Sequence, residues 1–176
     1  SIVISDINQQ ACDQVRSEFD PERSLVVVGN VANRDDCFNL AKAVTDKFGR
    51  IDVLINNAGI TQPVKFEEIL PEDYDRILDV NLRGMLYMSQ AVVPYMKAAK
   101  SGSIINTSSV SAQRGGGIFG GPHYSAAKAG MLGLGKAMAR ELGAFGIRIN
   151  SVTPGLIATD ITAGKLDDQM KAKILE

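Results

Sequence analysis

Short apolar runs alternate with helix-like segments along the whole chain, and this alternation constrains the fold more than any other feature. The runs are rich in β-branched residues and occupy residues 2–4, 25–28, 51–55, 103–107 and 147–152. Stretches with helical periodicity lie between them, at residues 8–19, 33–48, 71–97 and 123–142. No hairpin signal joins two runs, so the pattern predicts βαβ units, that is, an α/β fold with a parallel sheet and helices on both faces.

Local signals predict where several of these elements begin and end. Asn33 or Asp35 can cap the second helix, and Gly49 stands where the C-cap of that helix belongs. Pro94 lies inside the longest helical stretch and predicts a kink or an early end. Residues 109–122 are Gly-rich and polar, and we expect them to form a loop.

The composition narrows the class of protein. The chain has 176 residues, the length of one domain, and 45% of them are hydrophobic. Its net charge of -1, without a charged block, gives no reason to expect nucleic acid or a membrane surface as a partner. No apolar run reaches the roughly 18 residues of a membrane span.

Cysteine and histidine usage points away from metal chemistry. Cys12 and Cys37 show no metal-binding spacing, and we expect them to be reduced packing residues of a cytoplasmic protein. His123 is the single histidine, so neither a multi-histidine metal site nor a Ser-His-Asp mechanism is expected. We expect no metal, and we interpret His123 as a structural or surface residue.

Tyr124 and Lys128 are the first residues that suggest catalysis. Residues four positions apart lie on one face of a helix, so the phenol and the ammonium group can converge on one ligand atom. A nearby positive charge favours the phenolate, so we expect Lys128 to lower the pKa of Tyr124 from its reference of about 10. A tyrosine tuned in this way can exchange protons near neutral pH. The pair alone also fits a solvated helix without a catalytic role.

Taken with Asn56-Asn57-Ala58-Gly59 and Pro154-Gly155 in the same order, the pair resembles the short-chain dehydrogenase/reductase family over essentially the whole chain. The sequence is most similar to 3-oxoacyl-carrier-protein reductases and to sugar or polyol dehydrogenases. The resemblance implies a doubly wound, Rossmann-like parallel sheet in a three-layer αβα arrangement. It also implies a single NAD(P)-binding catalytic domain over residues 1–176, with ligands beyond the carboxyl ends of the strands.

The chain departs from the family pattern at both ends. Neither the family's first strand, with its TGxxxGxG turn, nor its last helix and strand has a counterpart here. The first strand is central in the family's sheet, so we expect two unpaired, apolar central edges. We therefore expect the chain to be part of a longer protein, incomplete at both ends. Residues 156–176 resemble the mobile substrate lid.

The resemblance implies four catalytic residues. Tyr124 would act as acid and base, Lys128 would assist it and bind the nicotinamide ribose, and Ser109 would hydrogen-bond the substrate oxygen. The family's usual spacing from the tyrosine gives Ser111 instead. We favour Ser109 because it directly follows a strand. Asn81, a poor helix former in mid-helix, would kink the long helix and hold a water molecule in a proton relay; the alternative is a buried structural amide.

The cofactor is expected to be NAD, with NADP possible. Asp6, at the end of the first apolar run, would accept the adenosine ribose hydroxyls and repel a 2′-phosphate, although Asp6 or Asn8 could instead cap the following helix. The full set of cofactor-binding residues that the resemblance implies is Asp6, Asn30, Val31, Asn56, Ala58, Gly59, Tyr124, Lys128, Pro154, Gly155, Ile157 and Thr159.

The expected function is hydride transfer between a nicotinamide cofactor and the carbonyl or secondary alcohol of a small-molecule substrate. We expect a 3-oxoacyl reductase-like enzyme that forms a homodimer or homotetramer. One alternative is an NAD-dependent sugar or polyol dehydrogenase. Alternatives of a different class are a non-catalytic nucleotide-binding scaffold and an inactive fragment, because a fold does not fix a function.

Overall fold

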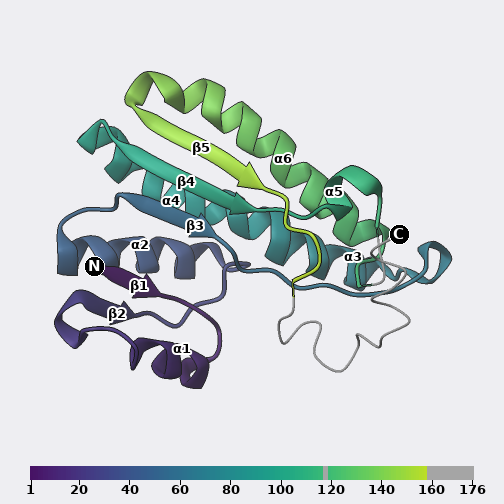
Figure 1. Ribbon diagram of the computed structural model, residues 1–176, viewed down its shortest axis with the longest axis horizontal. Helices are drawn as coiled ribbons and strands as arrows, with labels where there is room; N and C mark the ends of the chain where they lie inside the picture. Colours follow the sequence, from purple (N-terminus) through teal and green to yellow (C-terminus); the bar gives the residue numbers. More distant parts are fainter. Residues whose placement is uncertain (117–118, 158–176) are drawn as a thin grey trace.

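The computed structural model describes residues 1–116 and 119–157, and in this part of the chain every strand pairs in parallel (Figure 1). Strand β1 (Ile2–Ile4) pairs with β2 (Ser24–Val26). Strands β3 (Val53–Asn56), β4 (Gly102–Thr107) and β5 (Ile147–Val152) form a second sheet in that order. The predicted parallel α/β architecture is confirmed.

Helices fill the connections between the strands. They are α1 (Gln9–Arg16), α2 (Arg34–Phe48), α3 (Pro71–Leu78), α4 (Gly84–Ala99), α5 (Ser111–Arg114) and α6 (Pro122–Leu142), with 3-10 turns at Pro21–Arg23, Phe66–Glu68 and Gly143–Phe145. The side chain of Asn33 caps α2 by accepting from the backbone N–H groups of Asp35 and Asp36. Gly49 ends α2 with a left-handed φ of 74°, as predicted.

The stretch predicted as one long helix is interrupted, but not at Pro94. A π-helical segment, Asp79–Arg83, joins α3 to α4, and α4 continues through Pro94 to its end. The cause is Asn81, whose Nδ2 donates to the carbonyl oxygen of Ile77 at 2.8 Å and so competes with the backbone for that acceptor. Of the two outcomes predicted for Pro94, the early end is wrong, since α4 continues to Ala99, and Val92 and Met96 on either side of the proline are buried.

The core lies between one face of the β3–β5 sheet and helices α2, α4 and α6, which Figure 1 shows behind the strands. The register places Leu54, Ile104 and Ile149 in one row, and the last two are buried against these helices. On the opposite face Val53 and Ile55 are 54% and 59% exposed. The predicted loop at residues 109–122 contains the short helix α5, a correction in detail that leaves its connecting role unchanged.

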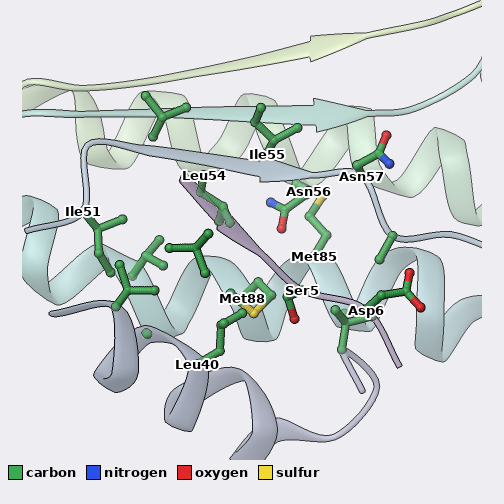
Figure 2. Close-up of a pocket in the computed structure, with 18 of the residues that line it drawn as sticks. Ser5, Asp6, Leu40, Ile51, Leu54, Ile55, Asn56, Asn57, Met85 and Met88 are labelled. Atoms are coloured by element: carbon green, nitrogen blue, oxygen red, sulfur yellow. The ribbon is translucent and has the colours of Figure 1, made fainter. Parts of the chain in front are cut away.

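A cavity of about 750 Å³ separates the two sheets. Strand β1 lines one side of it and β3 the other, and the two strands do not pair with one another. Figure 2 shows that Leu54 and Met88 project into the space between them. The expectation of two unpaired central edges is therefore confirmed for the described residues.

Candidate active site

Parallel strands bring their carboxyl ends to one edge of the fold, and the predicted site residues lie there. Asp6 follows β1, Asn57 follows β3, and Ser109 and Pro154 come shortly after β4 and β5. Figure 2 shows Asp6 and Asn57 at the same end of the cavity, with Ile51 at the other end. This edge is where ligands bind in open α/β sheets.

Lys128 is the most deeply buried charged group of the site. It lies in the second turn of α6 with 4% of its surface exposed, and its Nζ donates to the carbonyl oxygen of Thr107 at 2.8 Å. The backbone carbonyl of Lys128 accepts a hydrogen bond from Ser108 Oγ at 2.8 Å. Two bonds thus join α6 to the end of β4. Burial lowers the pKa of Lys128 to about 8.

Asn81 and Gly59 complete the surroundings of this lysine. Asn81 is 1% exposed and donates to the carbonyl oxygen of Ile60 at 2.9 Å as well as to Ile77. Its Oδ1 is buried without a hydrogen-bond partner in the described part of the chain. A Cβ on Gly59 would lie 2.7 Å from that oxygen and 3.3 Å from Lys128 Nζ, so only glycine fits between the two polar groups.

Tyr124 lies on the same face of α6, one turn before Lys128. A side-chain hydrogen bond with Ser109 lowers the pKa of Tyr124, but burial has the larger effect and raises it. Lys128 Nζ lies 5.7 Å from the centroid of the tyrosine ring and is turned toward Thr107. The expectation that Lys128 lowers the pKa of Tyr124 is therefore wrong for this structure, because the ammonium group is bonded elsewhere.

The structure separates the two candidate serines. Ser109 hydrogen-bonds with Tyr124, whereas Ser111 is buried at the start of α5 and donates its backbone N–H to Ser109 Oγ at 3.1 Å. Ser111 thus contacts Ser109, and Ser109 in turn contacts the tyrosine. The structure therefore places Ser109 nearer to Tyr124 than Ser111, and the catalytic role of Ser109 stays a prediction.

The residues expected near the adenosine end of a cofactor lie at the exposed edge. Asp6 is exposed and lines the cavity, and its Oδ1 accepts the backbone N–H of Asn8 at 2.9 Å. Asn8, and not Asp6, caps α1. Asn30 Oδ1 accepts from Ala32 N at 3.0 Å, and Val31 lines the cavity.

The predicted cofactor residues of the later turns fall into two groups. Asn56 is turned into the protein, where its Nδ2 donates to Asn106 Oδ1 at 2.9 Å and to Ser89 Oγ at 3.3 Å, so its role is structural in this structure. Ala58 lines the cavity. The carbonyl of Pro154 accepts from Val110 N at 3.0 Å, and Gly155 and Ile157 follow at the exposed edge.

The remaining predictions concern residues that the structure does not describe, or side chains outside the site. Thr159 and nearly all of the predicted lid at 156–176 lie outside the described residues. Cys12 and Cys37 are buried and unpaired, as predicted for packing residues, and burial raises the pKa of Cys37 to about 11. The sequence predicts that His123 is a structural or surface residue, and its 1% exposure shows that the surface alternative is wrong.

Sequence reasoning missed Gln62. Its backbone carbonyl accepts the N–H of Gly121 at 2.9 Å, and its side-chain oxygen lies 3.2 Å from His123 Nε2. These contacts fasten the segment after β3 to the start of α6. A glutamine in a loop carries no local signal for such a contact, because its partners are about 60 residues away in sequence.

The described residues contain neither a membrane-spanning helix nor a metal-binding cluster. No helix there is both long and apolar enough to cross a membrane. No group of three or more His, Cys, Asp or Glu side chains within residues 1–116 and 119–157 is placed to hold a metal ion.

Comparison with known proteins gives consistent matches. The family model described as short chain dehydrogenase matches residues 1–170. An uncharacterized short-chain type dehydrogenase/reductase of Sinorhizobium fredii is 51% identical over 99% of this chain and 70% of its own length. A 3-oxoacyl-[acyl-carrier-protein] reductase of Thermotoga maritima is 40% identical over 92% of this chain and 66% of its own.

A solved structure agrees with these matches. A short-chain dehydrogenase from Streptomyces avermitilis superposes with a TM-score of 0.82 and 30% identity, covering 90% of this chain and 58% of that one. The doubly wound, Rossmann-like fold is thereby confirmed. The chain spans between 58% and 70% of the length of these three proteins.

The buried lysine gives the site a distinct dependence on pH. In the unfolded chain Lys128 has the ordinary lysine pKa of 10.5, whereas in the folded chain its pKa is about 8. Between these values the unfolded state binds the extra proton, so the free energy of unfolding should rise with pH, by up to about 1.4 kcal/mol per pH unit. Urea unfolding from about pH 7 to 10 should show this rise, and Lys128→Met should remove it.

Lys136→Met is the matched control, because Lys136 lies on the same helix and is exposed. It should leave the slope unchanged. An equal slope in the wild type and in Lys128→Met would contradict the assignment of the shift to Lys128.

Proposed function

Because the chain belongs to the short-chain dehydrogenase family, we propose that it is an NAD(P)-dependent oxidoreductase that interconverts a carbonyl group and a secondary alcohol. The observation that supports this most strongly is the convergence of Ser109, Tyr124 and Lys128. They come from the end of β4 and the first two turns of α6, and they meet beside Asn81 at the carboxyl edge of the sheet.

The chemistry of these side chains supports a proton-transfer role. The phenol of Tyr124 donates a proton to a carbonyl oxygen in reduction and accepts one from the alcohol in oxidation. Ser109, which already hydrogen-bonds with Tyr124, holds the same substrate oxygen where charge changes during the reaction. With a pKa of about 8, Lys128 carries its charge at pH 7, where it can bind the ribose hydroxyls of a nicotinamide cofactor, as the family resemblance implies.

A proton path can continue from Lys128 through Asn81. The unpartnered Oδ1 of Asn81 faces the same space as Lys128 Nζ, and the missing side chain of Gly59 keeps that space open. A buried acceptor without a partner is a natural place for a water molecule. This arrangement supports the proposed relay role of Asn81 over a purely structural amide, although its Nδ2 also shapes the π-helical segment.

The residues around the carboxyl edge fit a dinucleotide cofactor. Asp6 offers an exposed carboxylate for ribose hydroxyls, and Ala58 and Gly59 leave the backbone accessible. When bound, a nicotinamide supplies or takes up the hydride. The further residues we propose for cofactor contact are Asn30, Val31, Pro154, Gly155, Ile157 and Thr159. We propose an indirect role for Asn56, whose hydrogen bond to Asn106 fixes the turn that follows β3.

A 3-oxoacyl thioester is the proposed substrate class. The relative from Thermotoga maritima bears the name of a 3-oxoacyl-[acyl-carrier-protein] reductase. A hollow of about 470 Å³ lies beside the start of α6, and Pro63, Val64 and Phe66 line it, the last 78% exposed. The same hollow is also lined by the charged Lys65 and Glu67, so the substrate class is proposed from the relative's name and not from this lining. A sugar or polyol dehydrogenase is the second candidate, and a non-catalytic scaffold fits less well because the catalytic set is complete.

Assembly and location form part of the same proposal. Ala126, Ala129, Gly133 and Ala137 form an exposed small-residue face on α6 that allows close helix approach in a homodimer or homotetramer. The unpaired thiols of Cys12 and Cys37 support a reducing, cytoplasmic compartment. Residues 156–176 are proposed as the substrate lid of a single catalytic domain.

Replacement of three hydroxyl groups tests the proposed catalytic set. Tyr124→Phe should lower kcat for NAD(P)H-dependent reduction of a 3-oxoacyl thioester by about 100-fold or more, because the proton donor is lost. Ser109→Ala should also lower kcat by about 100-fold. Ser111→Ala is the matched control and should stay close to the wild type. Turnover that survives in Tyr124→Phe, or a larger loss in Ser111→Ala than in Ser109→Ala, would refute the assignment.

Asp6 provides a test of cofactor choice. Asp6→Ala removes the carboxylate that repels a 2′-phosphate, so the preference for NADH over NADPH in kcat/KM should fall by about tenfold. Asp52→Ala is the matched control, because Asp52 lines the other end of the same cavity. An unchanged ratio in Asp6→Ala would show that another residue selects the cofactor.

A further inference from the structure

The segment that follows β3 crosses the start of α6 and is fastened to it through backbone groups. The N–H of Gly121 donates to the carbonyl oxygen of Gln62 at 2.9 Å, and Thr61 Oγ1 donates to the carbonyl oxygen of Phe119. Residues 61–64 therefore lie against the residues that lead into α6. The first turn of that helix carries both His123 and Tyr124.

The side chain of Gln62 joins this segment to the only histidine of the chain. Gln62 Oε1 lies 3.2 Å from His123 Nε2 and also 3.2 Å from Arg76 Nη2. Arginine can only donate, which identifies the Oε1 atom as the acceptor in both contacts. His123 must then donate through Nε2–H, and the neutral ring has its other nitrogen, Nδ1, unprotonated.

The surroundings of His123 disfavour a second proton. The residue is 1% exposed, and Nδ1 has no hydrogen-bond partner among the described residues. The charged groups that face it are Asp73 and Arg76, which act in opposite directions, and burial is the larger effect that lowers the pKa of His123. A proton on Nδ1 would be a buried donor without an acceptor.

Tight packing couples this ring to the catalytic tyrosine. A Cβ on Gly121 would lie 2.8 Å from His123 Cε1 and 2.8 Å from the carbonyl oxygen of Val64. A Cβ on Gly120 would lie 2.5 Å from Tyr124 Cδ1. The two neighbouring rings thus pack closely on two neighbouring glycines, which leaves little free space for either ring to move.

We propose that His123 is a positioning residue for Tyr124: as the neutral Nε2–H tautomer bound to Gln62, it fixes the first turn of α6 against residues 61–64. Arg76 holds Gln62 in the acceptor orientation. His123 does not contact the reacting atoms itself. The catalytic consequence rests on the proposed function of Tyr124, whereas the tautomer and the contact with Gln62 do not.

Nitrogen NMR of the full chain tests the contact directly, because a single histidine gives an unambiguous signal. In the wild type the imidazole should show the neutral Nε2–H pattern at about pH 8, and it should take up a second proton only below the ordinary pKa of about 6.5. Gln62→Leu removes the acceptor, so the histidine signals should shift and the ring signals of Tyr124 should shift with them. Gln90→Leu, an exposed glutamine on α4, is the control and should change neither.

Two results would overturn the structural part of the proposal. One is an Nδ1–H tautomer, or titration of the wild-type histidine near its ordinary pKa of about 6.5. The other is a Tyr124 spectrum that stays the same in Gln62→Leu. Both can be observed even if the protein reduces no tested substrate, so a failure of the proposed function does not hide a failure of this inference.

Kinetics test the catalytic part with acetoacetyl-coenzyme A as the probe substrate. His123→Leu and Gln62→Leu should each lower kcat by about tenfold with the KM for the cofactor unchanged, because misplacement of a catalytic group slows the chemical step. His123→Gln keeps an N–H donor at the end of the side chain and should recover most of the loss. The double variant should be no slower than either single variant, since both changes break the same contact.

A kcat that is unchanged in Gln62→Leu would refute the positioning role even if His123→Leu fails to fold. Losses that multiply in the double variant would also refute it, because they would mean that the two residues act independently. A wild type without activity, alongside the predicted NMR result, would instead refute the proposed function and leave the contact itself confirmed.

Discussion

The hydrogen bond from Lys128 Nζ to the carbonyl oxygen of Thr107 is the interaction on which the rest of the site depends. It fixes the distance between α6 and the end of β4, and these two elements carry Tyr124 and Ser109. A lysine with 4% exposure needs such a bond, because a buried ammonium group without a partner is costly. Burial, which disfavours the charged form, accounts for a pKa of about 8.

The same burial explains why the site combines a lysine that is easily deprotonated with a tyrosine that is hard to ionise. Both groups lie in the apolar junction between the sheet and α6, where the charged form of each is disfavoured. Burial therefore lowers the pKa of Lys128 and raises that of Tyr124. The two pKa values, ordinarily 10.5 for lysine and 10.0 for tyrosine, therefore move apart. The tyrosine keeps its proton at neutral pH, which suits a group that donates a proton.

Much of this arrangement could be predicted from the sequence. The apolar runs gave the parallel strands, Asn33 and Gly49 gave the ends of α2, and the order of the motifs gave the family. Local rules sufficed because each of these features depends on residues close in sequence. The early helix end predicted at Pro94 does not occur, because burial of the flanking side chains, a tertiary effect, outweighs the local preference.

Other features of the site depend on contacts that the sequence does not display. Asn56 turns inward because Asn106, its cross-strand neighbour, offers an acceptor. The side chain of Lys128 is oriented by the backbone carbonyl of Thr107. Because every residue has a backbone carbonyl, the sequence does not show which one the lysine will bind. The pKa of Tyr124 was therefore predicted with the wrong sign: the spacing showed that the ammonium group could reach the phenol, but not that it bonds to Thr107 instead.

The most direct test of this account is a carbon NMR titration of the Tyr124 phenol in the cofactor-free chain, in the wild type and in Lys128→Met. The account predicts a midpoint above the ordinary value of about 10, and little change in the variant, because burial dominates and Lys128 is bonded to Thr107. A midpoint below 10 that rises in Lys128→Met would show that the lysine already stabilises the phenolate, and would contradict the account.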